Sequence, residues 1–453
     1  MTNTNNPTVL ITPRKPALLQ GLAQKLPVLV RIQAPDADPT QQKVRRPYHL
    51  SLVIDRSGSM SGAPLAEAVR CAAHIVDRLE PTDVASLVVF DDHVTTLAPA
   101  QPVGNRSAMH TALAQVQSGG MTNLHGGWAA GAATLLPEAK EAALARVILL
   151  SDGNANAGEI TEPAAIAALC AEAAAQGVTT STYGLGEAFN EDLMVTMAQQ
   201  GNGNPYYGAT AADLFEPFAE EFDLIANLYA RHVRLSLTAP EGVKITLCND
   251  YPVEKREGFP AIRLPDIPFG AEAWVLLELE IGAGLALESG NNILQAGVTG
   301  ATPEGVPIAF TDALLTMKAL SPPAWEALLP DPLVLARQAE VEAGKLLAAA
   351  RAAAEHGDWK TIERILDEAK TRFADHPWVI DVLEHMAELA KARDAARFRK
   401  EATYSGRRMS TRLSSKLENL GSVADEAAAP SFVRRKTAQG KAQFDKRPED
   451  PSK

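Results

Sequence analysis

The stretch "HLSLVIDRSGSM" at residues 49–60 decides the fold of this chain and the position of its candidate site. An apolar run ends just before Asp55, and two hydroxyls follow at alternate positions, Ser57 and Ser59. Gly58 between the hydroxyls lets the backbone curl without a Cβ in the way. A surface turn needs polarity but no particular spacing. The regular spacing therefore predicts side chains that turn toward one point.

Apolar runs and amphipathic segments alternate around this stretch, over about residues 48–228. Short runs rich in β-branched residues predict strands at 49–54, 84–90, 145–151 and 177–186. Helical patterns lie at 63–80, 123–139, 162–177, 190–201 and 211–228. Strict alternation predicts an α/β fold with a Rossmann-like, doubly wound, mostly parallel sheet and helices on both faces. A hairpin at Asp91 and Asp92 predicts one antiparallel edge strand.

The pattern changes on both sides of this α/β domain, which we place at residues 46–228. Strand-like runs separated by Pro, Gly and Asn turns predict an antiparallel β-sandwich domain at 229–325. The β segment at 1–45 contains "KLPVLVRIQAP" and is expected to belong to the sandwich. Residues 326–400 predict a helical hairpin that either packs against the body or docks a partner. Residues 401–453 mix Lys, Arg, Ser and Pro without periodicity and predict a mostly disordered tail.

Composition narrows the classes of partner. The 453 residues carry a net charge of −12, which would repel nucleic acid or an anionic membrane, so neither is expected as a general partner. No signal peptide and no apolar run of about 18 residues are found, so we expect no transmembrane segment and a cytoplasmic location. Three cysteines lie far apart and are expected to be reduced. The sequence leaves the oligomeric state open.

Oxygen donors gather at the carboxyl edge of the predicted sheet. Asp55 ends the first strand of the α/β domain, where folds of this kind place their ligands. Thr122 in "SGGMTNLHGG" precedes a helix, and Asp152 in "VILLSDGNANAG" follows a neighbouring strand. Carboxylates and hydroxyls select a hard cation, Mg²⁺ or else Mn²⁺ or Ca²⁺, over zinc or copper. Two carboxylates nearly balance the charge of a dication, but the protein leaves the ion incompletely ligated, so such an ion would still attract an outside carboxylate.

These motifs resemble the metal ion-dependent adhesion site of von Willebrand factor type A domains, over about residues 48–228. The matching features are D-x-S-x-S, a threonine after paired glycines, and "SDG". The resemblance implies that the metal ligands are Asp55, Ser57, Ser59, Thr122 and Asp152, the last often through water. It implies a protein partner whose acidic side chain completes the coordination. The flanks are similar to those of bacterial intracellular proteins with this domain, so we expect an adaptor or scaffold and no enzyme.

Two alternatives come from other classes. A Mg²⁺-dependent phosphohydrolase would use Asp55 as nucleophile, but it needs a second Asp two residues on, where this chain has Ser57, and a hydroxyl is too weak an acid near neutral pH. A channel-like role is the other alternative, because some proteins with this kind of domain have been described as calcium-activated chloride channels, but the lack of a spanning segment argues against a pore. Asp91 and Asp92 are interpreted as hairpin residues and His93 as a surface group.

Overall fold

The structure is a computed structural model, and the part of the chain that it describes divides into two compact units. The α/β unit contains the described residues between 42 and 226, and residue 438. The discontinuous unit contains those of 1–41 and 227–437, so the chain leaves this unit, builds the α/β unit and then returns. The described residues are 6–37, 47–136, 144–185, 189–208, 210–254, 260–285, 290–416, 418 and 429–438.

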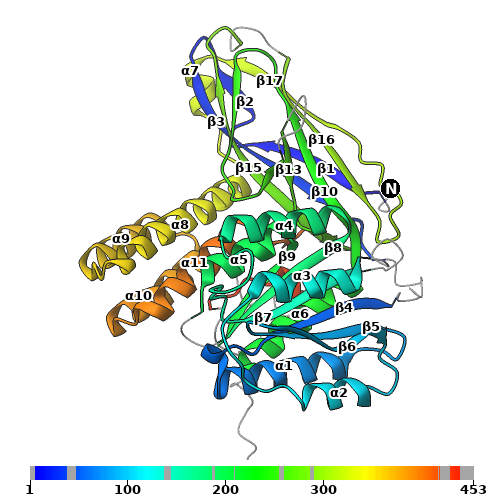
Figure 1. The fold of residues 1–453 in the computed structure, drawn as a ribbon. Coiled ribbons are helices and arrows are strands. Elements are labelled where there is room, and N and C mark those ends of the chain that lie inside the picture. The colour runs from blue at the N-terminus through cyan, green and yellow to red at the C-terminus, as the bar shows by residue number, and fades with distance from the viewer. Residues whose placement is uncertain are drawn as a thin grey trace, which may run out of the picture. The chain divides into compact units, whose positions relative to one another are not determined.

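A single sheet forms the centre of the α/β unit. Its strands are β4 (Tyr48–Asp55), β5 (Val84–Phe90), β6 (Val94–Pro102), β7 (Leu144–Ser151), β8 (Val178–Leu185) and β9 (Asn202–Gly208). The strand order is β6-β5-β4-β7-β8-β9, and only the β5–β6 pair is antiparallel (Figure 1). The predicted parallel sheet and antiparallel edge strand are confirmed. Because β4 pairs with both β5 and β7, the carboxyl ends of these three strands meet at one edge.

Helices cover both faces of this sheet, as predicted (Figure 1). They are α1 (Ala63–Arg78), α2 (Ser107–Leu113), α3 (Leu124–Leu135), α4 (Pro163–Ala175), α5 (Glu191–Gln200) and α6 (Ala211–Ala226). The short helix α2 and the strand β9 were not predicted. The β9 sequence "NGNPYYG" contains Gly and Pro, which suit an edge strand and hide the usual strand pattern. The predicted end of the helix at 123–139, which corresponds to α3, lies outside the described residues at 137–139.

Close packing of α3 onto the sheet positions the loop that precedes this helix. A Cβ added to Gly127 would lie 2.3 Å from ring atoms of Phe90, so the helix backbone rests directly against the side chain that ends β5. The side chain of Asn123 caps the helix by accepting a hydrogen bond from the Gly126 N–H at 2.9 Å. Thr122 is therefore held immediately before a fixed helix start.

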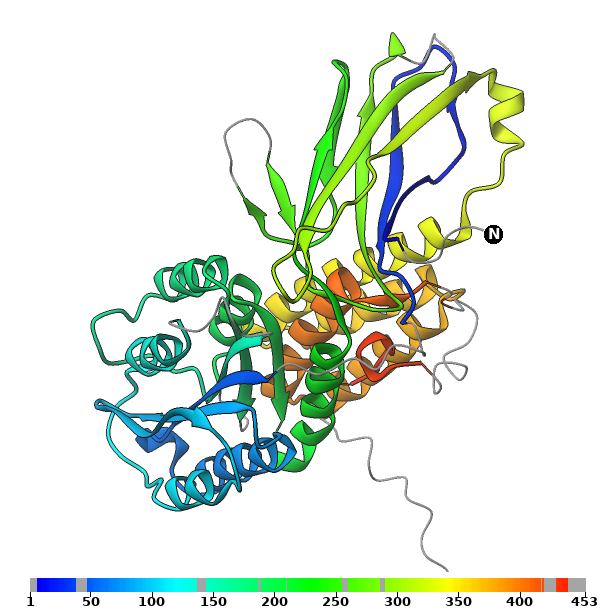
Figure 2. The ribbon, with the colours of Figure 1, turned by 90° about the vertical axis from the view of Figure 1, so that its right-hand side faces the viewer.

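Two mostly antiparallel sheets form the β part of the discontinuous unit (Figure 2). The strands are β1 (Thr8–Pro13), β2 (Ala17–Leu19), β3 (Gln24–Gln33), β10 (Leu228–Thr238), β11 (Val243–Leu247), β12 (Val253–Glu254), β13 (Ala261–Arg263), β14 (Ile267–Pro268), β15 (Ala271–Ile281), β16 (Asn291–Ala301), β17 (Ala313–Leu320) and β18 (Ser414–Ser415). One sheet has the order β1-β3-β15-β11, with β18 also on β15; the other has the order β12-β13-β10-β16-β17-β2, with β14 also on β10. Only β17 and β2 pair in parallel. The β3–β15 pairing shows that the N-terminal strands share a sheet with strands that follow the α/β unit.

The helical part of the discontinuous unit is larger than the predicted hairpin. Its helices are α7 (Pro322–Glu326), α8 (Pro332–Glu355), α9 (Trp359–Arg372), α10 (Pro377–Ala392) and α11 (Ala395–Thr411). Helices α8 to α11 share one apolar core. Helix α11 crosses α8 so closely that a Cβ on Gly344 would lie 2.9 Å from the Gly406 carbonyl oxygen. The segment expected to begin a tail therefore completes a helical bundle.

Buried ion pairs explain why the prediction of a mostly disordered tail from residue 401 onward was wrong for part of this segment. Arg412, just after α11, lies 3.3 Å from Glu340 of α8, and Arg337 lies 2.9 Å from the same carboxylate. Glu418 pairs with Arg337 at 3.0 Å and with Arg412 at 2.5 Å. Burial would raise the pKa of Glu340, but the two arginines outweigh burial and hold the pKa well below its usual range. Composition alone cannot show that basic residues meet buried acidic partners. The rest of the predicted tail, at 417, 419–428 and 439–453, lies outside the described residues.

Candidate metal centre

Asp55 ends the central strand β4 and has no solvent-exposed surface. One carboxylate oxygen, Oδ1, accepts a hydrogen bond from the Ser57 N–H at 2.9 Å. The other, Oδ2, accepts from the Ser151 hydroxyl at 2.5 Å. Ser151 ends β7, the neighbouring strand, and its Oγ also accepts from the Gly153 N–H at 2.8 Å. The carboxylate is thus held in place by the ends of two adjacent strands.

The two hydroxyls of the motif turn toward each other. The Oγ atoms of Ser57 and Ser59 lie 3.1 Å apart, with Ser57 buried and Ser59 exposed. The Gly58 N–H between them donates to the Gly120 carbonyl at 2.8 Å. A Cβ at Gly58 would lie 3.5 Å from that oxygen, which is an ordinary van der Waals distance, so little space remains for a larger side chain. The spacing that the sequence presents therefore does bring the hydroxyls together, next to the loop that carries Thr122.

Hydrogen bonds join the Thr122 loop to the loop after β7. The Thr122 N–H donates to the Asn156 side-chain oxygen at 2.8 Å. The Thr122 carbonyl accepts from the N–H groups of Asn156 and Ala157, each at 3.1 Å. Thr122 itself is 1% exposed. Asn156 was not among the predicted site residues, although it lies in the quoted "SDGNANAG" stretch; a sequence offers no distinction between this asparagine and its neighbour Asn154.

Asp152 directly follows β7 and is nearly buried, at 6% exposure. Its Oδ1 accepts from the Asn154 N–H at 3.1 Å, and its backbone carbonyl accepts from the Asn190 N–H at 2.7 Å. Gly153 has φ of +68°, a backbone conformation that favours glycine and that turns the chain sharply after the strand. The "SDG" sequence thus places the carboxylate at the same sheet edge as Asp55.

The electrostatics of these carboxylates favour a bound cation. Burial, with a smaller contribution from the negative charge of Asp152, raises the pKa of Asp55 to about 6 against the hydrogen bonds from Ser151 and Ser57. Within the part of the chain that the structure describes, no Lys, Arg or His forms an ion pair with Asp55 or Asp152. Buried carboxylates are normally paired or coordinate a metal. The donors are all oxygens, which fit a hard dication.

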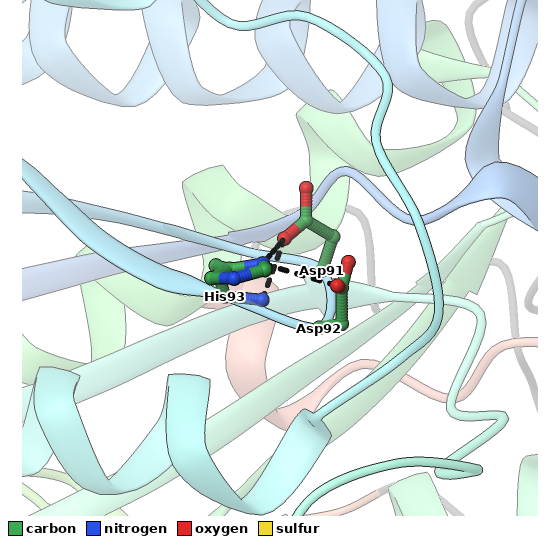
Figure 3. Close-up of side chains that lie close together, drawn as sticks. All are labelled: Asp91, Asp92 and His93. Carbon is green, nitrogen blue, oxygen red and sulfur yellow. Dashed lines mark hydrogen bonds and ion pairs between the residues drawn. The ribbon is translucent and has the colours of Figure 1, made fainter.

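A second group of ligand-type side chains lies on the β5–β6 turn. Asp91, Asp92 and His93 each offer one atom, and these atoms lie within 4.8 Å of one another (Figure 3). The hairpin predicted at Asp91 and Asp92 is confirmed by the antiparallel β5–β6 pair. The His93 ring is 81% exposed, in agreement with its interpretation as a surface group. This group is a possible metal-binding cluster that the sequence did not predict, since three consecutive polar residues at a turn are common.

The phosphohydrolase alternative finds no support in this geometry. The residue two positions after Asp55 is Ser57, whose hydroxyl lies against the Ser59 hydroxyl. No described carboxylate takes the place of the general acid that this reaction would need at that position.

None of the described helices combines the length and the apolar character that crossing a bilayer requires.

Sequence comparisons place this chain among known proteins. The sequence model described as "von Willebrand factor type A domain" matches residues 49–220. The uncharacterized protein sll0103 of a Synechocystis strain is 26% identical over 272 residues, which are 56% of this chain and 61% of that protein. Inter-alpha-trypsin inhibitor heavy chain H3 of Mesocricetus auratus is 29% identical over 220 residues, 46% of this chain and 24% of that protein. The chain thus spans less than two thirds of the length of these relatives.

Solved structures share the fold. A "von Willebrand factor type A" protein from Catenulispora acidiphila superposes with a TM-score of 0.65 at 15% identity, over 85% of this chain and 91% of that chain. The ArnB paralog VWA2 from Sulfolobus acidocaldarius has a TM-score of 0.57 at 19% identity, over 89% of this chain and 99% of that chain. Both the family match and the strand order with its loop geometry lead to the same conclusion. Residues 49–220 of this chain are a von Willebrand factor type A domain.

Proposed function

We propose that the α/β unit is a protein-binding module that works through a divalent cation, with no catalysis of its own. The proposed ligands, as the sequence predicted them, are Asp55, Ser57, Ser59, Thr122 and Asp152. When bound, the cation supplies a positive site to which an acidic side chain of a partner protein can attach. Mg²⁺ is the proposed ion, with Mn²⁺ or Ca²⁺ as substitutes, because the donors are carboxylate and hydroxyl oxygens.

The observation that carries this proposal is a pair of buried carboxylates with which no described Lys, Arg or His forms an ion pair. Asp55 and Asp152 are 0% and 6% exposed and lie on loops joined through Thr122 and Gly58 by backbone hydrogen bonds. Because these bonds already fix the loops, little conformational entropy remains to be lost when a cation binds. The chain's own residues therefore hold the oxygens in place before the ion arrives.

The surface beside the site supports a protein partner. Met121 directly precedes Thr122, and its side chain is 59% exposed. Its backbone is anchored on both sides, because the Gly120 carbonyl accepts from Gly58 and the Thr122 N–H donates to Asn156. A methionine adapts its shape to many apolar surfaces. We propose that the partner's acidic residue has an apolar neighbour that packs on Met121. Because the contact consists of one bond to the cation and a small surrounding surface, we expect a dissociation constant on the order of micromolar.

The wider role is proposed as that of an adaptor or scaffold in the cytoplasm. The relatives named above give support only for the type A domain, since this chain spans part of their length. The cysteines Cys71, Cys170 and Cys248 are free, which is compatible with a reducing compartment. Fractionation of the native cell, with the chain detected in each fraction, would test the location.

Titration calorimetry of the full chain with Mg²⁺ and Mn²⁺ tests the metal site. We expect saturable binding at one site that Asp55→Ala abolishes and that the matched variant Asp77→Ala, an exposed carboxylate of α1, leaves unchanged. Affinity capture from the native cell with and without chelator then tests the partner. A captured protein should be lost with chelator and with Asp55→Ala, and substitution of one acidic residue in it should abolish capture. Binding that persists in chelator would contradict the proposal.

A further inference from the structure

Asp91 occupies a buried position between the first two loops of the proposed cation site. It directly follows β5, the strand beside β4, and is 5% exposed. Arg56, the residue between Asp55 and Ser57 in the D-x-S-x-S motif, faces it: the Arg56 Nε lies 3.0 Å from Asp91 Oδ2. The Arg56 N–H donates to the Phe90 carbonyl at 2.8 Å, so its backbone is fixed as well.

The other polar atoms of Asp91 are also in use. Its Oδ1 accepts from the His93 N–H at 2.7 Å, and its backbone carbonyl accepts from the Asn123 N–H at 2.8 Å. The Gly120 N–H lies close enough to the carboxylate to stabilise its charge. Burial would raise the pKa of Asp91, but the His93 N–H, the charge of Arg56 and the Gly120 N–H outweigh it and lower the pKa. The carboxylate is therefore ionised and fully engaged by its own protein.

The glycines before Met121 make room for this carboxylate. A Cβ on Gly119 would lie 1.7 Å from Asp91 Oδ2, and one on Gly120 would lie 2.2 Å from Asp92 Oδ1. The Gly119 N–H also donates to the Arg56 carbonyl at 2.7 Å. The paired glycines are thus needed for the loop that carries Thr122 to lie against the β5–β6 turn.

We propose that Asp91 is a positioning residue for the cation site: it neutralises Arg56, which stands between two of the proposed ligands in the sequence. This inference rests on the proposed function. The group in Figure 3 is then no metal centre of its own, because Arg56 and the His93 N–H already engage the two Asp91 oxygens. Asp92 lies 3.0 Å from the His93 ring as an exposed pair. An unneutralised Arg56 would repel a dication bound at its two sequence neighbours.

The test is Mn²⁺ titration calorimetry on the full chain. Asp91→Asn keeps the shape of the side chain but leaves the Arg56 charge unpaired, so we expect Mn²⁺ affinity to fall about tenfold. The matched variants Asp92→Asn and His93→Ala should bind Mn²⁺ within about twofold of wild type. Arg56→Gln should bind at least as tightly as wild type, and the double variant Arg56→Gln/Asp91→Asn should recover most of the loss.

Recovery of Mn²⁺ binding by the double variant separates an electrostatic role of Asp91 from a merely structural one. If the double variant binds as weakly as Asp91→Asn, or if Arg56→Gln weakens binding, neutralisation of Arg56 is refuted. If Asp92→Asn or His93→Ala removes a binding event, the turn is itself a metal site and the proposal is overturned. Failure of the proposed function has a different signature, namely no Mn²⁺ binding by wild type or full binding by Asp55→Ala. Should Asp91→Asn fail to fold, the Arg56→Gln result still decides.

Discussion

Replacing Asp55 by asparagine should stabilise the cation-free protein, although it removes a proposed ligand. Burial raises the pKa of this carboxyl from 3.8 to about 6, so ionising it in the folded state costs about 3 kcal/mol at neutral pH. Asparagine avoids this cost and can still accept from the Ser57 N–H. It loses an acceptor for the Ser151 hydroxyl, which costs about 1 kcal/mol. The net gain in the free energy of unfolding is about 2 kcal/mol.

The pH dependence has a definite sign. Below the unfolded pKa of 3.8 the Asp55 carboxyl is protonated in both states and contributes no difference. As the pH rises toward the folded pKa of about 6, the folded state resists losing the proton that the unfolded state has lost, so the wild-type protein loses stability relative to the variant. The loss is complete above that value. The advantage of the variant should therefore be large at about pH 7.5 and small at about pH 4.5.

Urea unfolding of the full chain in chelator, at both pH values, measures this difference, with Asp92→Asn as a control that alters an exposed carboxylate. Addition of Mg²⁺ should reverse the order at neutral pH, because wild type alone gains binding energy, about 2.7 kcal/mol at a hundred times the dissociation constant. If Asp55→Asn is less stable than wild type in chelator at neutral pH, the reasoning from burial is wrong.

Three further predictions concern the rim of the site and the helical bundle. Met121→Ser should weaken partner capture without changing Mn²⁺ affinity in calorimetry, whereas Thr122→Ala should weaken both. If the two variants lower Mn²⁺ affinity equally, the rim role of Met121 is contradicted. Glu340→Gln should lower the free energy of unfolding by about 3 to 5 kcal/mol in urea titrations, because each of two buried arginines loses one of its carboxylate partners, and an unchanged value would refute the ion-pair argument. Gly344→Ala should cost about 1 to 3 kcal/mol in the same assay, since its Cβ would press on a carbonyl of the opposing helix, while Gly284→Ala, with no atom near its Cβ, should be neutral.

Local patterns were sufficient for most of the α/β unit. Each strand of a parallel sheet buried on both faces is a nearly continuous apolar run, and each crossover helix has an apolar stripe. Both are visible without tertiary information. What failed was short or atypical: β9 contains Gly and Pro, and α2 has only 7 residues. Beyond residue 400, composition was misleading because the basic residue Arg412 pairs with Glu340, which is far away in the sequence.

The candidate site shows the same division. Its proposed ligands could be found from the sequence because the D-x-S-x-S spacing and the ends of strands are local features. The residues that hold those ligands could not: Asn156 reaches Thr122 from another loop, and Asp91 reaches Arg56 from the neighbouring strand. No pattern distinguishes these two from ordinary turn residues, since their partners are 34 and 35 positions away.

The sequence by itself determined most of the strands and helices of the α/β unit and the kinds of donor atom at the end of β4, because both follow from the periodicity and chemistry of short segments. Only the tertiary structure decided that Asp55 is buried beside Asp152, with no cationic partner among the described residues, and that Arg56 forms an ion pair with Asp91. The physical reason is that burial and charge pairing depend on which distant segments meet, and the free energy of an ionised side chain depends on those neighbours more than on its own sequence context.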